Sequence, residues 1–322
     1  MQAPSLVEPT SAAARRNAPA TLECVRARGL VAAAVVASGG VLLAGCGGSS
    51  GSSSPPTTSA SGSTVNAIPG TEDYEPGPVR VSFLLLNEQG AEVDRPSVEV
   101  AVATSDTGKP FTTAPARLEP IGVPGSEPAV GNVSRLYVAH FSVPRAGIYS
   151  LTATSAGKKP VRATWHIQVR KTPAAPGIGT RAIASDTPTI ASAHGRLAAL
   201  TTRTPPDTVL LRYSVAESLA AHKPFVLVFA TPKFCTSRTC GPVVDVVLAV
   251  QKRLAGTGVR FIHVEIYKDN NPGKGDNRWV REWHLPTEPW IFLVGKDGRI
   301  NGRFEGSVSV AELAAAVRRD LT

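Results

Sequence analysis

The sequence contains little sulfur. Met1 is its single methionine, and its four cysteines are Cys24, Cys46, Cys235 and Cys240. Because methionine thioethers suit soft copper ions, their scarcity argues against a copper-delivery protein. Cys235 and Cys240 lie close together, with four residues between them. In an exported protein, two such thiols would indicate one disulfide, and redox chemistry is one use of it.

The chain also lacks a basic segment interleaved with aromatic residues. Its formal net charge is +9 and aromatic residues make up 6% of it, but the positive charges are scattered. A modest, scattered excess of positive charge favours contact with anionic lipid or wall polymer over nucleic-acid binding. We therefore expect no nucleic-acid partner.

The apolar run near the N-terminus is too short to span a bilayer comfortably. It extends from Gly29 to Leu43 and follows Arg26 and Arg28. Its end, Leu43-Ala44-Gly45-Cys46, resembles a bacterial lipobox. In that family the peptide is cut just before the cysteine, which takes the lipid. The resemblance implies a signal peptide at residues 1–45 and acyl chains such as palmitate on the cysteine; an uncleaved membrane anchor is the alternative.

Residues 46–77 have the composition of a flexible tether. They are rich in glycine, serine, threonine and proline. A lipoprotein carries more than one acyl chain, and several chains hold a protein stably on a membrane. We therefore expect a lipid-anchored, extracytoplasmic protein on the outer face of the cell membrane.

Residues 78–171 predict an all-β domain. Segments 79–86, 98–102 and 136–143 contain alternating apolar and polar side chains, as half-buried strands do. Glycine and proline turns separate the strands at regular spacing, which favours an antiparallel sandwich. The phrase Ala146-Gly147-Ile148-Tyr149 before a strand resembles exported immunoglobulin-like modules, which implies an immunoglobulin-like sandwich.

Residues 172–207 predict a linker. They are rich in proline, alanine, threonine and serine, a composition typical of segments with little structure. The chain after the signal peptide is long enough for two domains of ordinary size. We expect the domains on either side of this segment to fold independently.

Residues 208–322 predict an α/β domain. Strands are expected at 225–230, 259–266 and 290–294, with helices at 243–254 and 277–284 between them. The first strand is fully apolar, which is typical of a strand buried on both faces of a sheet. Strands that alternate with helices indicate a parallel or mixed sheet with helices on both faces.

Four motifs of this domain resemble the thioredoxin superfamily. They are the apolar strand 226–230 leading to Cys235, the loop 269–273, the segment Glu288-Pro289-Trp290 before a strand, and the hairpin Lys296-Asp297-Gly298. The resemblance implies a thioredoxin-like fold with a cis bond before Pro289. It also implies that Pro289 and Trp290 line a substrate groove, although Trp290 is equally well explained as a core aromatic.

The cysteine pair is the expected catalytic site. Cysteine reacts as a thiolate, which a helix N-terminus or a cation stabilises. Gly241-Pro242 is a good helix opening, and Lys233 and Arg238 add positive charge. We therefore expect Cys235 to be the nucleophile and Cys240 the resolving thiol. The string Cys240-Gly241-Pro242 also resembles the start of the C-x-x-C motif of thioredoxins, which would swap the two roles.

The pair departs from the family in two ways. Four residues separate the cysteines where thioredoxins have two, and Val228 and Phe229 occupy the stretch where the family has a buried acid. Proton handling must therefore differ. A purely structural bridge is the alternative, but closing so short a loop constrains the unfolded chain little. The weakness of such a bridge favours a functional pair.

Other families use similar motifs. Atypical two-cysteine peroxiredoxins carry C-T-x-x-x-C-G, which residues 235–241 match, but Val228 stands at their proline position and Thr231 is one residue out of place. Copper-delivery proteins of the thioredoxin fold add a distal histidine, for which His263 and His284 are available. A non-catalytic domain that only recognises a partner is the remaining alternative.

The sequence as a whole predicts a membrane-anchored, extracytoplasmic thiol–disulfide oxidoreductase. It would act through Cys235 and Cys240 on thiols or disulfides of exported proteins, and it would exchange electrons with an unknown partner. We expect neither a metal nor a cofactor.

The lipobox generates the first testable prediction. We expect Cys46 to be the first residue of the mature chain and to carry lipid, because the motif ends a short apolar run behind two arginines. Mass spectrometry of the N-terminal peptide from the membrane fraction should show an acylated Cys46, and Cys46→Ser should release the protein from membranes. A soluble protein that begins at another residue contradicts the prediction.

Overall fold

The computed structural model describes residues 63–125, 134–235 and 239–322. The predicted signal peptide, Cys24, Cys46, most of the predicted tether and Arg238 lie outside these ranges. Residues 58–322 belong to one compact unit. Within the described ranges, none of the helices has both the length and the apolar character that crossing a bilayer requires.

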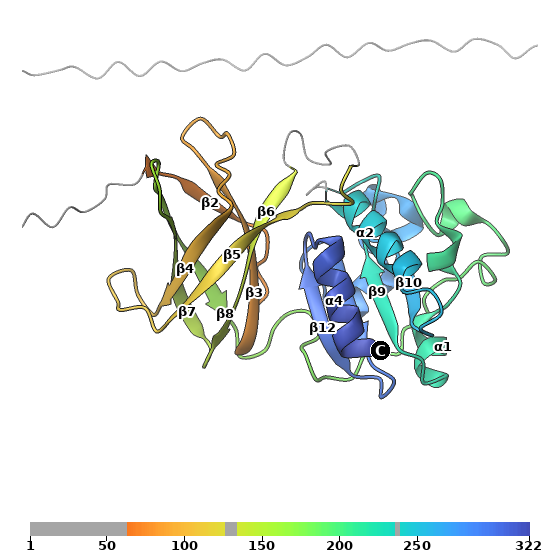
Figure 1. The fold of residues 1–322 in the computed structure, drawn as a ribbon. Coiled ribbons are helices and arrows are strands. Elements are labelled where there is room, and N and C mark those ends of the chain that lie inside the picture. The colour runs from red at the N-terminus through yellow and green to blue at the C-terminus, as the bar shows by residue number, and fades with distance from the viewer. Residues whose placement is uncertain (1–62, 126–133, 236–238) are drawn as a thin grey trace, which may run out of the picture. The chain divides into compact units, whose positions relative to one another are not determined.

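The N-terminal part is all β. Its strands form one sheet of eight in the order β1-β8-β7-β4-β5-β6-β3-β2 (Figure 1). The strands are β1 (Ser63–Thr64), β2 (Asn66–Pro69), β3 (Gly77–Leu86), β4 (Ser97–Ala103), β5 (Thr112–Pro120), β6 (Arg135–Val143), β7 (Gly147–Ser155) and β8 (Val161–Val169). Buried and exposed residues alternate strictly along β8, as period-2 patterning requires. The predicted all-β region is confirmed.

The first two strands connect the two ends of this sheet. β1 pairs in parallel with β8, and β2 pairs antiparallel with β3. One buried core lies inside, where Phe83 stacks on Tyr137 at 5.3 Å between ring centroids and contacts Trp165 at 4.7 Å. Val65 and Tyr74 belong to the same core. The structure therefore adds residues 63–77 to the β region, where composition predicts tether.

The C-terminal part is an α/β domain with a four-stranded mixed sheet of order β10-β9-β11-β12. β9 and β10 are parallel, and β11 is antiparallel to both β9 and β12. The strands are β9 (Phe225–Phe229), β10 (Arg260–Val264), β11 (Trp290–Val294) and β12 (Ile300–Glu305). The helices are α1 (Val215–Ala220), α2 (Cys240–Arg253), α3 (Arg278–Glu282) and α4 (Val310–Leu321). Short 3-10 turns are η1 (Leu197–Ala199), η2 (Thr208–Leu211), η3 (Lys268–Asn270) and η4 (Pro272–Lys274).

Helices cover both faces of this sheet, as predicted. Val226 and Val228 of β9 pack in one core with α2 and α4, which lie on the same side in Figure 1. Phe225, Leu227 and Phe229 pack in a second core with residues of α1 and α3. β9 is thus buried on both faces, which explains its unbroken apolar sequence.

The segment predicted to be a linker lies against the α/β domain. Ala175 is buried in the core of the α1 and α3 face, and Leu200 packs with Leu211 in a small core of its own. The side chain of Ser185 donates to Glu282 at 2.7 Å and accepts from Trp283 at 3.0 Å. These contacts make the segment part of the α/β domain's packed surface. The structure therefore does not describe residues 172–207 as a flexible linker between two separate domains.

Buried charges connect the β region to the α/β domain. Asp73 accepts from the backbone of Ala174 and Ala175 at 2.9 and 3.1 Å, and its carboxylate lies 3.1 Å from the Arg303 guanidinium. Only 1% of the Asp73 side chain and 8% of the Arg303 side chain are exposed. Glu305 accepts from the backbone N–H groups of Glu72 and Asp73 at 2.7 and 2.9 Å.

A second ion pair connects the same two parts. The Arg80 guanidinium donates to both carboxylate oxygens of Glu312 at 2.7 and 2.9 Å, a bidentate geometry. Burial alone would raise the pKa of the Glu312 carboxyl, but the Arg80 charge and hydrogen bonds from His140 and Arg80 lower it to about 2.

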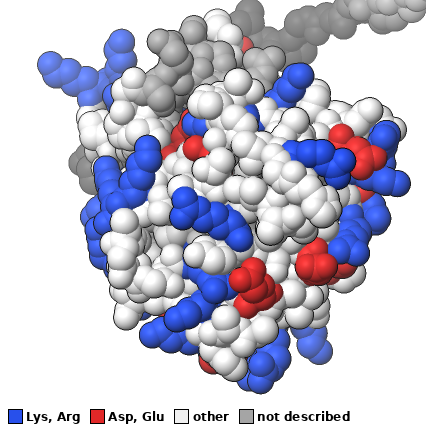
Figure 2. Space-filling view, turned by 90° about the vertical axis from the view of Figure 1, so that its right-hand side faces the viewer, with Lys and Arg blue, Asp and Glu red and all other residues white. Residues whose placement is uncertain are grey.

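The surface charges are scattered, as the sequence indicates. Figure 2 shows Lys and Arg distributed over the face it presents, with Asp and Glu among them.

The burial of Asp73 generates a stability prediction. Asp73→Ala leaves the Arg303 guanidinium buried without this carboxylate, so the free energy of unfolding should fall by about 3–5 kcal/mol. Asp94→Ala is the matched control. Its carboxylate is 49% exposed and 4.0 Å from Arg135, so the loss should be about 0.5 kcal/mol or less. Urea unfolding followed by tryptophan fluorescence measures both, and equal losses would contradict the prediction.

Candidate functional site

Cys235 and Cys240 meet where β9 passes into α2. Cys235 lies in the loop after β9 and is partly exposed, whereas Cys240 is the first residue of α2 and is fully buried. Both are free thiols, and the backbone N–H of Cys240 donates to the Cys235 sulfur at 3.2 Å. An N–H at a helix N-terminus stabilises negative charge. The sulfur that is accessible to a substrate is therefore the one that the helix terminus favours as a thiolate.

The second thiol has the opposite environment. Burial raises the pKa of Cys240 far above its ordinary range, and the hydrogen bond and charge of Cys235 and the charge of Glu288 act in the same direction. A backbone hydrogen bond at Thr231 opposes them without reversing the shift. Cys240 is therefore a protonated, shielded thiol, which suits a resolving role that begins only after Cys235 has reacted.

Glu288 is the third group of the site. One carboxylate oxygen of Glu288 and the two cysteine sulfurs all lie within 4.8 Å of one another. The sheet register explains the meeting: Trp290 pairs with Phe229, so the residue two positions before Trp290 lies level with the chain that leads to Cys235. In the sequence, Glu288 stands out only as part of the motif Glu288-Pro289-Trp290. Its place before a proline that opens a buried strand was the available signal.

The proline motif itself has the predicted geometry in one respect. The Glu288–Pro289 peptide bond is cis, as expected from the resemblance. Trp290 needs a correction as a groove residue, because only 1% of it is exposed. Its ring stacks on Phe292 at 5.7 Å between centroids, and the Arg303 guanidinium lies over the Trp290 ring, 5.6 Å from its centroid. Trp290 is a core aromatic, the alternative that the sequence left open.

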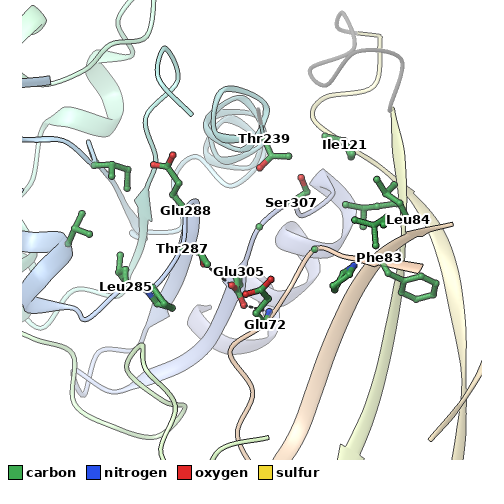
Figure 3. Close-up of a pocket in the computed structure, with 18 of the residues that line it drawn as sticks. Glu72, Phe83, Leu84, Ile121, Thr239, Leu285, Thr287, Glu288, Glu305 and Ser307 are labelled. Carbon is green, nitrogen blue, oxygen red and sulfur yellow. Dashed lines mark hydrogen bonds between the residues drawn. The ribbon is translucent and has the colours of Figure 1, made fainter. Parts of the chain in front are cut away.

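A cavity of about 610 Å³ opens beside the site. Figure 3 shows Glu288, Thr287 and Thr239 among its lining side chains. The walls are largely apolar, and they come from both the β region and the α/β domain, with Ile68, Leu84, Ile121 and Leu136 from the former and Ile266, Val280 and Leu285 from the latter. A volume of this size is in the range of small-ligand and side-chain pockets. A substrate that reaches Cys235 therefore has an apolar surface beside it.

The segment before the α/β domain supports the cysteine loop. Thr202 donates its hydroxyl to the buried carboxylate of Glu265 at 2.8 Å and accepts from the backbone N–H of Lys233 at 3.1 Å. Thr202 thereby connects β10's end to the loop that carries Cys235. The Lys233 ammonium lies 5.3 Å from the centre of the Phe234 ring. Lys233 is exposed in this loop, two residues before Cys235.

Neither histidine considered for copper joins the cysteines. His263 is buried, and its Nε2 lies 3.1 Å from the carbonyl oxygen of Ala230. His284 is exposed on the turn after α3. Among the residues that the structure describes, the group of potential metal ligands at the site contains Glu288 and no histidine. The histidine-dependent copper site is therefore not assembled.

The contrast between the two thiols predicts their chemical reactivity. At about pH 8, iodoacetamide should modify Cys235 rapidly and Cys240 slowly, because Cys240 is buried and its pKa is raised. Peptide mapping by mass spectrometry distinguishes each cysteine. Equal rates for the two thiols in the reduced protein would contradict the prediction.

The raised pKa of Cys240 has a matching effect on stability. Its thiol stays protonated in the folded chain at a pH where an unfolded cysteine, with a pKa of about 8.5, has lost its proton. The unfolded state then binds fewer protons, so the free energy of unfolding should fall as the pH rises above that value. Cys240→Ser should weaken this dependence in urea unfolding, and an unchanged slope would count against it.

Comparisons with known proteins add little. No protein-family model matches the chain, and no curated protein matches it. Among the solved structures that match it is a thioredoxin-family thiol:disulfide interchange protein from Chlorobium tepidum TLS, which is 17% identical to it. The match covers 34% of this chain and 86% of that chain, with a TM-score of 0.25. A likeness of this size carries no conclusion about fold or activity, so the function has to be inferred from the site itself.

Proposed function

We propose that this protein exchanges thiols and disulfides through Cys235 and Cys240. The observation that carries the proposal is the unequal pair: an accessible sulfur that accepts the first N–H of α2 at 3.2 Å, with a buried, protonated thiol behind it. An inert bridge needs no such difference between its two sulfurs. An exchange site does, because one thiol must attack and the other must wait.

The reaction divides into two exchanges. The Cys235 thiolate attacks one sulfur of a substrate disulfide, that S–S bond breaks, and the other substrate sulfur leaves as a thiolate. The mixed disulfide is then attacked by Cys240, which gives up its proton, and the substrate leaves as a second thiolate. The protein ends with a Cys235–Cys240 disulfide and the substrate has gained two electrons. In the reverse direction the protein oxidises a dithiol.

Glu288 belongs to the second exchange. Cys240 has to lose a proton before it attacks, and the family's usual buried acid is absent from β9, where Val228 and Phe229 stand. The Glu288 carboxylate lies within 4.8 Å of both sulfurs and is partly exposed. It is therefore placed to accept the Cys240 proton, directly or through one water molecule, and to pass it to solvent.

The finer parts of the proposal come from sequence. The α/β domain is proposed to be thioredoxin-like, since its elements β9-α2-β10-α3-β11-β12-α4 follow the order that the resemblance implies. The β region is proposed to be an immunoglobulin-like module, and Cys46 to anchor the protein by lipid on the outer face of the membrane. Substrates would then be thiols or disulfides of exported proteins, with Pro289 at the edge of the site.

Trapping of the intermediate tests the function. Cys240→Ser should accumulate mixed disulfides between Cys235 and substrate proteins, because the resolving thiol is missing. Cys235→Ser should accumulate none. Non-reducing electrophoresis of membrane fractions, followed by mass spectrometry of the linked peptides, measures both. Trapping by Cys235→Ser alone would instead assign the attack to Cys240.

One control variant and two further outcomes complete the test. Asp276→Asn changes a nearby exposed acid and should leave trapping by Cys240→Ser unchanged. If neither cysteine variant traps a partner and a neutral small disulfide is not reduced, the exchange function is wrong and a binding role replaces it. Consumption of peroxide by one thiol, much faster than by a model thiol, would identify a peroxidase.

A further inference from the structure

The three potential ligands at the site come from elements that the core holds in place. Cys240 begins α2, whose buried residues pack against β9, and Glu288 leads directly into β11. β9 and β11 are neighbours in the sheet over five residue pairs. Two of the three ligands therefore have fixed backbones, and Cys235, held by the N–H of Cys240 at 3.2 Å, is the third.

Their spacing suits a single metal ion. A tetrahedral zinc ion with Zn–S bonds of about 2.3 Å holds its two sulfurs about 3.8 Å apart. The two sulfurs and the carboxylate oxygen already lie within 4.8 Å of one another. The three donors therefore start close to the spacing that one ion requires, and side-chain rotation would bring them onto it. Three protein ligands leave a fourth position for water or another ligand, as in open zinc sites.

The ligand types select among metals. Two thiolates disfavour Mg²⁺ and Ca²⁺, which take oxygen ligands, and a carboxylate is a poor third ligand for soft Cu(I). Zn²⁺ accepts cysteine sulfur and carboxylate oxygen in the same site. A divalent ion would deprotonate the cysteine thiols on binding and would then offset the negative charge of two thiolates and one carboxylate at one partly buried place.

We propose that the reduced Cys235–Cys240 pair and Glu288 bind one zinc ion, and that forming the Cys235–Cys240 disulfide releases it. The release step rests on the proposed exchange function, whereas the metal site does not. In that step the two thiolates give two electrons to an incoming disulfide, which leaves as two thiolates. The zinc ion leaves unchanged as Zn²⁺, because a disulfide no longer supplies thiolate ligands.

Cobalt is the probe for the site. The full chain carrying Cys24→Ser and Cys46→Ser is reduced and titrated with Co²⁺ in detergent without oxygen. We expect one equivalent to give the intense visible and near-ultraviolet bands of tetrahedral, thiolate-bound cobalt, and Zn²⁺ to displace it. In this background Cys240→Ser should abolish the thiolate bands. A chain that gives no such spectrum overturns the proposal.

Variants of Glu288 test whether its carboxylate is a zinc ligand. Glu288→Gln removes a direct ligand, so it should weaken zinc binding by at least the roughly tenfold that loss of an outer-shell partner costs, and Glu288→His, which restores a zinc ligand, should recover much of the loss. Asp276→Asn, which changes an acid outside the cluster, should have no effect. If Glu288→Gln binds zinc as tightly as the unchanged chain, Glu288 is not a zinc ligand. This holds even if the substitution changes the pH profile of thiol–disulfide exchange.

The release step has its own measurement. Hydroxyethyl disulfide, a neutral oxidant, is added to the zinc-loaded chain in the presence of a chromogenic zinc indicator. We expect one zinc ion to be released for each protein disulfide formed. If the metal-free chain reduces this disulfide but never binds zinc, the metal site is wrong and the exchange function stands. If zinc binds and no disulfide reacts, the exchange function and the release step are both wrong and the site alone remains.

Discussion

The pairing of β9 with β11 is the constraint on which the site depends. Both strands are buried along their whole length, with Trp290 opposite Phe229 and Val294 opposite Phe225. A slip of one residue would turn every side chain of a strand to the opposite face. The two cores on the two faces of the sheet therefore fix the register, and the register fixes the distance between the cysteine loop and Glu288. The placement of the site at the ends of these two strands is therefore a consequence of packing in the centre of the sheet.

Buried charges fix the contact between the β region and the α/β domain, as the strand register fixes the site. Asp73 and Arg303 are 230 residues apart in sequence and meet with almost no exposure to solvent. Such a pair disfavours other packings of the two parts, because separating its members leaves a buried charge without its partner. The bidentate contact of Arg80 with Glu312 adds a second point of attachment. Together they define a specific contact between the β region and the α/β domain.

What the sequence predicted was local. The alternation of β8, the apolar run of β9, the close cysteines and the cis bond at Pro289 all follow from neighbouring residues, and each is present in the structure. What it missed depends on distant partners. Glu288 is recognisable as a site residue only once β11 lies beside β9. The Pro- and Ala-rich segment with Thr202 resembles a linker until Glu265 and Lys233 are seen to bond with it.

The depth of Cys240 behind Cys235 also decides how the site would withstand oxidants. A solvent oxidant reaches the partly exposed Cys235 and not the buried thiol. The first product, a sulfenic acid on Cys235, forms beside a thiol that condenses with it to give a disulfide and water. That product is reversible, whereas further oxidation to a sulfinic acid is generally not. Disulfide formation with the buried thiol would therefore divert oxidised Cys235 to a state that an ordinary reductant can reverse.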